Sequence, residues 1–168
     1  MSWLSSLFAS KSAAQTVKQV AKSKATWAAA AVVFVGGFEG LRLNAYRDPV
    51  GIATVCYGET LGVKMGQSHT RAECDAMFLA RLEEFNAGMS KCAPGPMPDE
   101  RRVAFVSFAY NIGTGAFCKS TLSKKYRAGD IRGACDELLK WDKAAGIRLA
   151  GLTRRRQAER ELCLKGLQ

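Results

Sequence analysis

The cysteines are the feature that most constrains how this chain can fold. There are six, they are dispersed along the chain, and no two of them form a CxxC pair. The only histidine is His69, so the clustered Cys and His ligands of a zinc site are missing. The pattern favours three disulfides formed in an oxidising compartment, and six free thiols in a cytosolic protein are the alternative. The positions are Cys56, Cys74, Cys92, Cys118, Cys135 and Cys163.

Length and charge narrow the possibilities further. The 168 residues suit one folded domain, with room for a short extra segment. Lys and Arg number 25 against 15 Asp and Glu, and the net charge of +10 attracts polyanions such as nucleic acid, anionic lipid and the acidic bacterial wall. Charge alone does not choose among these partners, and a solubilising surface explains it equally well. The sequence has no fixed-period repeat, which excludes solenoid and collagen-like folds.

The N-terminal part of the chain differs in texture from the rest. Residues 1–24 are basic and contain no acidic residue, and Ala25–Phe38 carries no charge at all. This uncharged run is shorter than the roughly 20 residues that span a bilayer, and it is rich in Ala and Gly. It predicts a buried core helix, which we favour, or a marginal membrane segment that can enter and leave the bilayer. We therefore divide the chain into a basic extension, 1–24, and a folded domain, 25–168, that opens with an apolar helix over 25–38.

Turn and strand signals follow this helix. Asp48-Pro49-Val50-Gly51 has the residue preferences of a β-turn, with Pro in the second place and Gly in the fourth. The next segment, Ile52–Tyr57, is rich in β-branched and aromatic residues. Together they predict a small hairpin or a three-stranded sheet.

Beyond Thr70 the chain is predicted to be helical. Thr70 and Glu73 form a capping box, and the helix they open should reach about Asn86. Residues 92–98 are rich in proline and predict a loop. Further helices are expected to begin at four caps and run from Asp99 to Ile112, Ser120 to Tyr126, Asp130 to Trp141 and Thr153 to Leu164. The fold class is therefore α+β, with a small β-rich lobe joined to a larger helical lobe and a cleft between them suited to a polymer.

Three polar residues around the predicted hairpin have the chemistry of a glycosidase site. Glu39 follows the uncharged run, Asp48 lies at the turn and Thr54 lies on the predicted strand. Glycoside hydrolysis needs one carboxyl group that protonates the leaving oxygen and, as a rule, a second that stays ionised. The apolar neighbours of Glu39 favour a protonated carboxyl, whereas the polar turn favours an ionised Asp48. Taken singly, each residue also suits a commonplace role as a solvated helix end, a turn former or a β-prone residue.

Three separated segments resemble the phage-type lysozymes, glycoside hydrolase family 24. Residues 38–58, FEGLRLNAYRDPVGIATVCYG, resemble the catalytic signature of that family. Residues 107–122, SFAYNIGTGAFCKSTL, and 151–163, GLTRRRQAERELC, resemble later parts of it. The likeness covers about residues 34–166 and is greatest to phage and prophage endolysins. It implies a mainly helical two-lobe lysozyme-like fold, in which 25–168 form the catalytic domain.

The resemblance implies an activity and roles for individual residues. The enzyme would be an N-acetylmuramidase that hydrolyses the β-1,4 bond between N-acetylmuramic acid and N-acetylglucosamine during host lysis, without a cofactor or metal. Glu39 would be the general acid, Asp48 and Thr54 would position or activate the attacking water, and inversion would be expected. The positions that match the lining of the saccharide cleft are Gly58, Tyr110 and Ser120, which equally suit a turn glycine, a core aromatic and a helix cap.

The resemblance also implies a disulfide pairing and a location. By analogy with the lobes of the family, the pairs would be Cys56–Cys74, Cys118–Cys135 and Cys92–Cys163. The apolar run before Glu39 resembles the signal-arrest-release segments that hold some endolysins inactive at the inner membrane. We expect a monomer that acts on peptidoglycan strands in the host periplasm after export or holin-mediated release. Glu59 departs from the family, because many relatives have His there, and it adds a third carboxylate near the site.

Two other functions are consistent with the charge. A cationic protein that lyses membranes without catalysis would use the basic N-terminus and the Arg154–Arg156 run. A module that binds the bacterial wall or nucleic acid is the other, and nucleic-acid binding would show a steep loss of affinity with salt. The sequence has no recognition motif for nucleic acid beyond its charge, so we expect no nucleic-acid partner.

Overall fold

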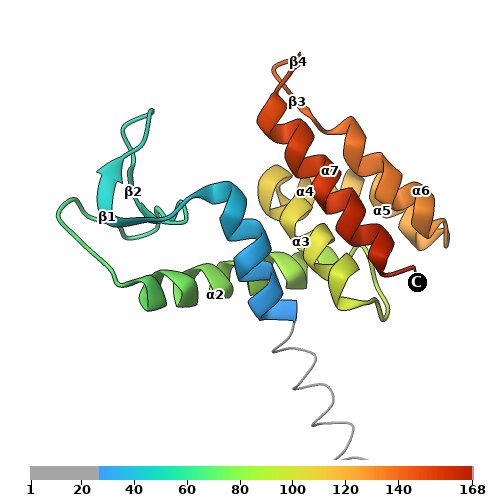
Figure 1. Ribbon diagram of the computed structural model, residues 1–168, viewed down its shortest axis with the longest axis horizontal. Coiled ribbons are helices and arrows are strands. Elements are labelled where there is room, and N and C mark those ends of the chain that lie inside the picture. Colours follow the sequence, from blue (N-terminus) through green and yellow to red (C-terminus); the bar gives the residue numbers. More distant parts are fainter. Residues whose placement is uncertain (1–26, 168) are drawn as a thin grey trace, which may run out of the picture.

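The computed structural model describes residues 27–167. These residues form two parts, a small β-hairpin and a larger helical body (Figure 1). The small part is the hairpin of β1 (Arg42–Arg47) and β2 (Ala53–Cys56), and the larger part is helical. The long helix α2 (Arg71–Ser90) runs from one part to the other and contacts both β2 and α3 (Asp99–Ile112). This arrangement agrees with the predicted small β-rich lobe joined to a larger helical lobe.

A helix over residues 27–39 opens the described part of the chain. Trp27, Ala28, Ala31 and Val35 are buried at helical spacing, whereas Val33 is 78% exposed. The helix therefore packs through one apolar face, as a core helix does. Among the described residues no helix is long and apolar enough to cross a membrane. The predicted basic extension, 1–24, lies outside the described residues.

The β1–β2 hairpin has the turn that the sequence predicts. The strands are antiparallel and pair Tyr46 with Thr54, with a bulge between Arg42 and Tyr46. Asp48 closes the turn, because its Oδ1 accepts hydrogen bonds from the backbone N–H groups of Val50 (3.0 Å) and Ile52 (2.8 Å). The segment that follows the hairpin adds no third strand to this sheet and makes only isolated bridges with it, between Asn44 and Ser68 and between Val55 and Glu59. Of the two predicted alternatives, the hairpin is therefore correct and the three-stranded sheet is not.

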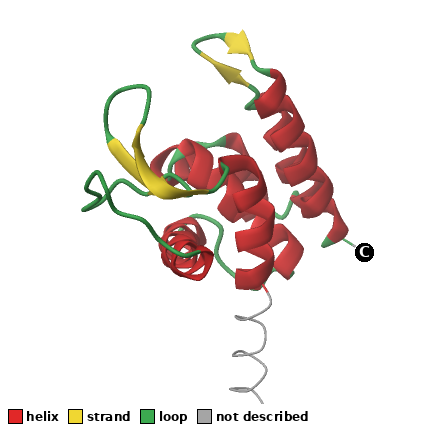
Figure 2. Cartoon of the chain, turned by 60° about the vertical axis from the view of Figure 1, so that its left-hand side comes forward, coloured by secondary structure: helices red, strands yellow, loops and turns green. Residues whose placement is uncertain are grey.

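The remaining elements are three short helices, a 3-10 turn, a second hairpin and the longer helix that follows it. This hairpin, like the first, projects from the helical body (Figure 2). Its strands are separated by Ala145 and Gly146. The elements are α4 (Thr114–Lys119), α5 (Thr121–Arg127), α6 (Ile131–Glu137), the 3-10 turn η1 (Leu138–Lys140), β3 (Lys143–Ala144), β4 (Ile147–Arg148) and α7 (Ala150–Lys165).

Three of the predicted helix caps are confirmed and two are wrong. Thr70 and Glu73 form the reciprocal capping box, and Ser120 and Asp130 accept the backbone N–H groups of Ser123 and Gly133. Asp99, by contrast, lies inside the first turn of α3, where its charge suits the helix dipole, and Pro98 precedes it as the cap. Helix α7 begins one turn earlier than predicted. Thr153 therefore does not cap it, and its hydroxyl donates to the Leu149 carbonyl or the Asp142 carboxylate, each 3.2 Å away.

Helix α3 is the centre of the helical part. It is buried along most of its length, including Val103, Phe105 and Phe108, and it packs against α2, α4 and α7. A helix that is apolar on several sides belongs in the middle of a core, which explains why its apolar residues do not form a single stripe.

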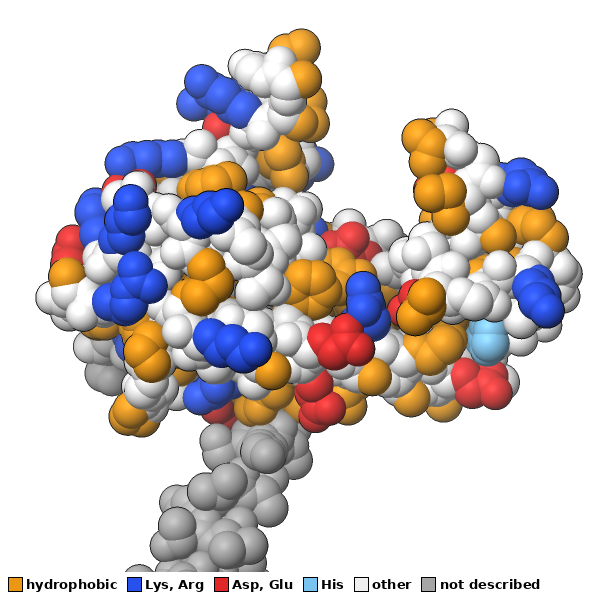
Figure 3. All heavy atoms as spheres, turned by 180° about the vertical axis from the view of Figure 1, so that it is seen from behind, with side chains coloured by type: hydrophobic (Ala, Val, Ile, Leu, Met, Phe, Trp, Pro, Cys, Tyr) orange, Lys and Arg blue, Asp and Glu red, His pale blue; other side chains and the backbone are white. Residues whose placement is uncertain are grey.

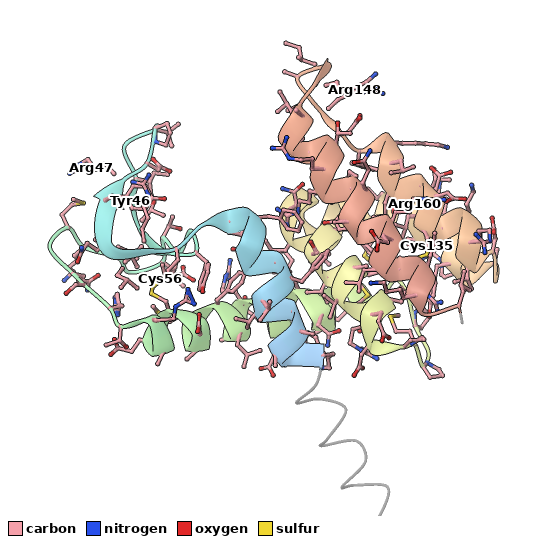
Figure 4. The ribbon with its side chains drawn as sticks, in the orientation of Figure 1. Tyr46, Arg47, Cys56, Cys135, Arg148 and Arg160 are labelled. Carbon is pink, nitrogen blue, oxygen red and sulfur yellow. A yellow bond between two sulfur atoms is a disulfide. The ribbon has the colours of Figure 1, made fainter. Side chains whose placement is uncertain are left out.

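Three disulfides are present, as the cysteine count predicts, but only one of the three implied pairs is correct. Cys56–Cys74 joins β2 to α2. The other two pairs are Cys92–Cys118, between the proline-rich loop and α4, and Cys135–Cys163, between α6 and α7. The implied Cys118–Cys135 and Cys92–Cys163 pairs are wrong because α6 packs along α7, which brings Cys135 to Cys163. In Figure 4, Cys56 and Cys135 lie in different parts of the molecule.

Candidate active site

Glu39 lies at the junction of the two parts. It ends the first helix, and Gly40 then adopts a positive φ of 74°, which turns the chain into β1. The Glu39 side chain is 23% exposed, and its Oε1 accepts a hydrogen bond from Arg155 Nη1 at 2.7 Å. One carboxyl oxygen is thus held by a guanidinium from α7, 116 residues away in sequence.

Arg155 is fixed on several sides. Its side chain is only 5% exposed, and its Nε donates to Glu159 Oε1 at 3.1 Å, one helical turn further along α7. Its Nη2 donates to the backbone carbonyl of Ser107 in α3, also at 3.1 Å. The guanidinium carbon lies 5.1 Å from the centre of the Phe38 ring, a cation–π contact. The group that contacts Glu39 therefore has little freedom to move.

A buried ionic cluster continues behind Arg155. Glu159 Oε1 accepts from the Ser107 hydroxyl at 2.6 Å, and its Oε2 lies 2.8 Å from Arg156 Nη1. Arg156 also donates to the Asn111 side chain. Burial raises the pKa of Glu159, whereas Arg156, the Ser107 hydroxyl and Arg155 act to lower it. Burial likewise lowers the pKa of Arg156, and Glu159 opposes that shift.

Tyr110 of α3 lies near Glu39. Burial raises the pKa of Tyr110 to about 12, with smaller contributions from the charges of Glu39 and Glu59, so the phenol is neutral near pH 7. Its hydroxyl donates to the Tyr57 carbonyl at 3.4 Å. A pocket of about 240 Å³ opens beside it, and Gly58, Glu59 and Arg81 contribute to the lining. Two of the three residues predicted to line the saccharide cleft, Gly58 and Tyr110, thus line one pocket.

Asp48 and Thr54 lie in the same hairpin. Thr54 pairs with Tyr46, two residues before Asp48, and Tyr46 and Arg47 are labelled in Figure 4. The Thr54 side chain is buried, and its hydroxyl donates to the Ile52 carbonyl at 3.0 Å. Seen from behind, the surface is hollowed between the two projecting parts, with acidic side chains inside the hollow (Figure 3).

Two other residues singled out from the sequence have clear local roles. Ser120 is buried, its hydroxyl donates to the Phe117 carbonyl at 2.6 Å, and it caps α5. This geometry supports the cap and gives no support to a saccharide contact. Glu59 Oε1 accepts from the N–H groups of Thr60 and Leu61, and its Oε2 lies 3.8 Å from Arg81 Nε. The carboxylate that departs from the family therefore closes a turn and pairs with α2.

Sequence reasoning missed the importance of Arg155 and Glu159. The membrane-lysing alternative uses the positive charge of the Arg154–Arg156 run, yet Arg155 and Arg156 are buried. The spacing of Arg155 and Glu159, four residues apart on a helix, is the one signal that indicates an ion pair. No group of His, Cys, Asp and Glu in the part of the chain that the structure describes could hold a metal ion.

Comparisons with known proteins identify the family and the fold. The phage lysozyme family model matches residues 36–159. The SAR-endolysin of Bacteriophage PS119 is 42% identical over 133 residues, which cover 79% of this chain and 80% of that protein. Among solved structures, the endolysin from the Escherichia coli phage FAHEc1 has a TM-score of 0.72 at 33% identity, covering 80% of this chain and 90% of that one. The active form of the P1 phage endolysin Lyz has a TM-score of 0.74 at 28% identity, covering 83% and 85%.

The agreement extends from sequence to fold. The family match includes Glu39, Asp48, Thr54 and Arg155. The two-part α+β architecture is that of the solved phage lysozymes, which confirms the predicted lysozyme-like fold. The chain therefore belongs to the phage lysozyme family and is a peptidoglycan-hydrolysing muramidase of the endolysin type.

Proposed function

We propose that Glu39 is the general acid that protonates the glycosidic oxygen between N-acetylmuramic acid and N-acetylglucosamine. The observation that carries this proposal is the way the carboxyl is held. Arg155 contacts Oε1 alone, while the side chain stays partly exposed at the junction of the two parts. Oε2 is then the oxygen available to carry the proton to the substrate. Tyr110, a neutral phenol nearby, adds no competing negative charge.

Asp48 and Thr54 act on the water in this proposal. The proton of the Thr54 hydroxyl is committed to the Ile52 carbonyl, so its oxygen is free to accept a hydrogen bond from water. The backbone N–H groups that donate to Asp48 Oδ1 fix that carboxyl at the end of the hairpin. Water attacks the anomeric carbon, its proton passes to Asp48, and the leaving oxygen takes the proton of Glu39. Attack from the opposite face would invert the anomeric centre.

The test is a Glu39→Gln variant assayed on purified peptidoglycan. Loss of the acid should remove the clearing of wall suspensions, a loss of at least about 100-fold. Glu83→Gln, an exposed change on α2, is the matched control and should keep full activity. Melting temperatures of both variants show whether they fold. Mass spectrometry of the products should show muramic acid at the new reducing ends. Full-rate clearing by a folded Glu39→Gln protein would sink the proposal.

The chain also fits an endolysin that is held at the inner membrane before it acts in the periplasm. A relative at 42% identity is called a SAR-endolysin, and the uncharged run here follows a basic stretch. In the folded enzyme residues 27–38 of this run lie in the helix that ends at Glu39, so a membrane-held run would keep the acid away from Arg155. Fractionation of cells that produce the full chain should find an early membrane-bound form. A chain that is soluble throughout would contradict the tether.

We further infer that the released enzyme is a monomer. One copy supplies the acid, the guanidinium that holds it and both residues assigned to the water. Light scattering of the purified protein should give a mass near 18.2 kDa.

A further inference from the structure

The ionic cluster behind the active site contains a buried acid that the mechanism above does not use. Glu159 is fully buried, as is Arg156, and the Arg155 side chain is 5% exposed. Burying charged groups is costly unless they are closely paired. Hydrophobic residues of similar size would fill the same space at a lower cost in desolvation. The cluster therefore calls for an explanation beyond packing.

The geometry connects this acid to the active site through one guanidinium. Arg155 presents Nη1 to Glu39 at 2.7 Å and Nε to Glu159 at 3.1 Å, so two carboxyl groups share its charge. Glu159 is itself held, because the Ser107 hydroxyl donates to it from α3 and Arg156 pairs with it from α7. Because the guanidinium is planar and rigid, it cannot rotate further toward Glu39 without losing its contact with Glu159.

We propose that Glu159 is a positioning residue for the catalytic acid, which orients Arg155 and limits how strongly positive charge holds Glu39 in its ionised form. The proposal rests on the assignment of Glu39 as the acid. With Glu159 ionised, Arg155, Arg156 and Glu159 together carry a single net positive charge. Without that carboxylate, both guanidiniums would act on Glu39 uncompensated. The acid would then lose its proton at lower pH and would be unable to protonate the leaving oxygen at the working pH.

The charged and titratable groups that face these residues come from two helices. Arg155 of α7 and Tyr110 of α3 act on Glu39, and Tyr110 stays neutral. Glu159 is faced by Ser107 of α3 and by Arg155 and Arg156 of α7. The two carboxyl groups lie on opposite sides of one guanidinium, a separation of roughly 6 Å. At an effective dielectric constant of about 20, removing a unit charge at that distance shifts the midpoint of a titration by about one to two pH units.

The experiment measures rate against pH on solubilised peptidoglycan at fixed ionic strength. Glu159→Gln keeps the shape of the side chain and removes its charge. We expect the descending, high-pH limb of its profile to move about one to two pH units toward acid. Glu161→Gln removes the same charge from an exposed position on α7 where it pairs with Lys165 at 3.7 Å, and its limb should stay in place. A merely structural role for Glu159 would lower the rate equally at every pH.

A second variant gives the opposite sign. Arg156→Met removes a positive charge from the cluster and replaces the arginine with an uncharged, apolar side chain of similar length. Its descending limb should move toward alkaline pH, and this variant decides the matter if Glu159→Gln does not fold. Shifts in opposite directions support the proposal. An unmoved limb in a folded variant, or shifts in the same direction, overturns it. Inactivity of Glu39→Gln is measured separately, so a wrong assignment of the acid is distinguishable from a wrong role for Glu159.

Discussion

The Cys135–Cys163 disulfide can be removed by replacing both cysteines with alanine. It joins α6 to α7, and both residues are fully buried. Helix α7 carries Arg155 and Glu159, so the disulfide anchors the helix that holds the acid. Neither cysteine contacts the active site, and we therefore expect the double variant to lose stability and to keep its activity per folded molecule at low temperature.

The expected loss follows from the length of the closed loop. The two cysteines are 28 residues apart, and the chain-entropy estimate for a loop of that length is about 3.6 kcal/mol. That is a large share of the roughly 5–15 kcal/mol that stabilises a typical domain. In a domain of this size it corresponds to a fall of about 10 °C in Tm. Removing Cys56–Cys74, with a separation of 18, should cost slightly less, about 3.2 kcal/mol.

The assay has two parts. Urea denaturation of the oxidised wild type and of each double variant gives the free energies of unfolding. A tryptic digest without reduction then identifies the pairs, because trypsin cuts between all six cysteines. Peptide 133–140 should be linked to 161–165, and 92–101 to 103–119. Links between 92–101 and 161–165, or between 103–119 and 133–140, would refute the pairing. A stability loss below about 1 kcal/mol would refute the loop argument.

Two further stability changes are expected. Thr70→Ala removes the capping box of α2 and should cost about 1 kcal/mol by urea denaturation, whereas Thr70→Ser should cost much less. Glu137 is paired with Lys125 (2.7 Å) and Lys140 (2.8 Å), and their hydrogen bonds lower its pKa below the ordinary value of 4.5. Its contribution to stability is present above pH 4.5 and is lost as pH falls through the lowered pKa, so the cost of Glu137→Gln should shrink in acid. A cost that is independent of pH would contradict this assignment.

The parts of the fold that the sequence predicts are those set by neighbouring residues. The turn at Asp48 and the caps at Thr70, Ser120 and Asp130 each depend on a side chain that bonds backbone within four residues. Such contacts form whatever the rest of the chain does, which is why local patterns indicate them. Asp99 shows the limit, because an acid at a helix start suits both the cap and the first turn.

The second hairpin has almost no local signal. Its turn places Ala145 at a φ of 49° and Gly146 at 80°, and Ala is a poor residue for a positive φ. Its two-residue strands are too short to show an alternating pattern. Contacts at the base of the hairpin hold it instead, since Leu149 N–H donates to the Asp142 carbonyl and Arg148 pairs with the Asp142 carboxylate at 2.8 Å.

The candidate active site likewise combines residues that are close in sequence with one that is distant. The residues proposed for catalysis, Glu39, Asp48 and Thr54, lie in one continuous segment, and the hairpin that relates two of them is local. Arg155 reaches Glu39 from 116 residues away, and no local pattern can report such a contact. Two of the three implied disulfide pairs are wrong for the same reason, since Cys135 meets Cys163 through the packing of α6 on α7. In Figure 4, Arg160, which pairs with Asp136, bridges the same two helices.

The position of Glu39 ties its chemistry to the docking of the first helix. Val35, one turn before it, is fully buried, and Phe38, next to it, contacts the guanidinium of Arg155. Withdrawing this helix would remove Glu39 from Arg155 and would leave the guanidinium buried against Glu159 and the Ser107 carbonyl. The cluster would then hold one carboxylate for two guanidiniums, so a net positive charge would stay buried without Glu39 to compensate it. Docking of the first helix therefore brings the Glu39 carboxyl to this buried charge, and we expect its withdrawal both to remove the proposed acid from the site and to weaken the helical part.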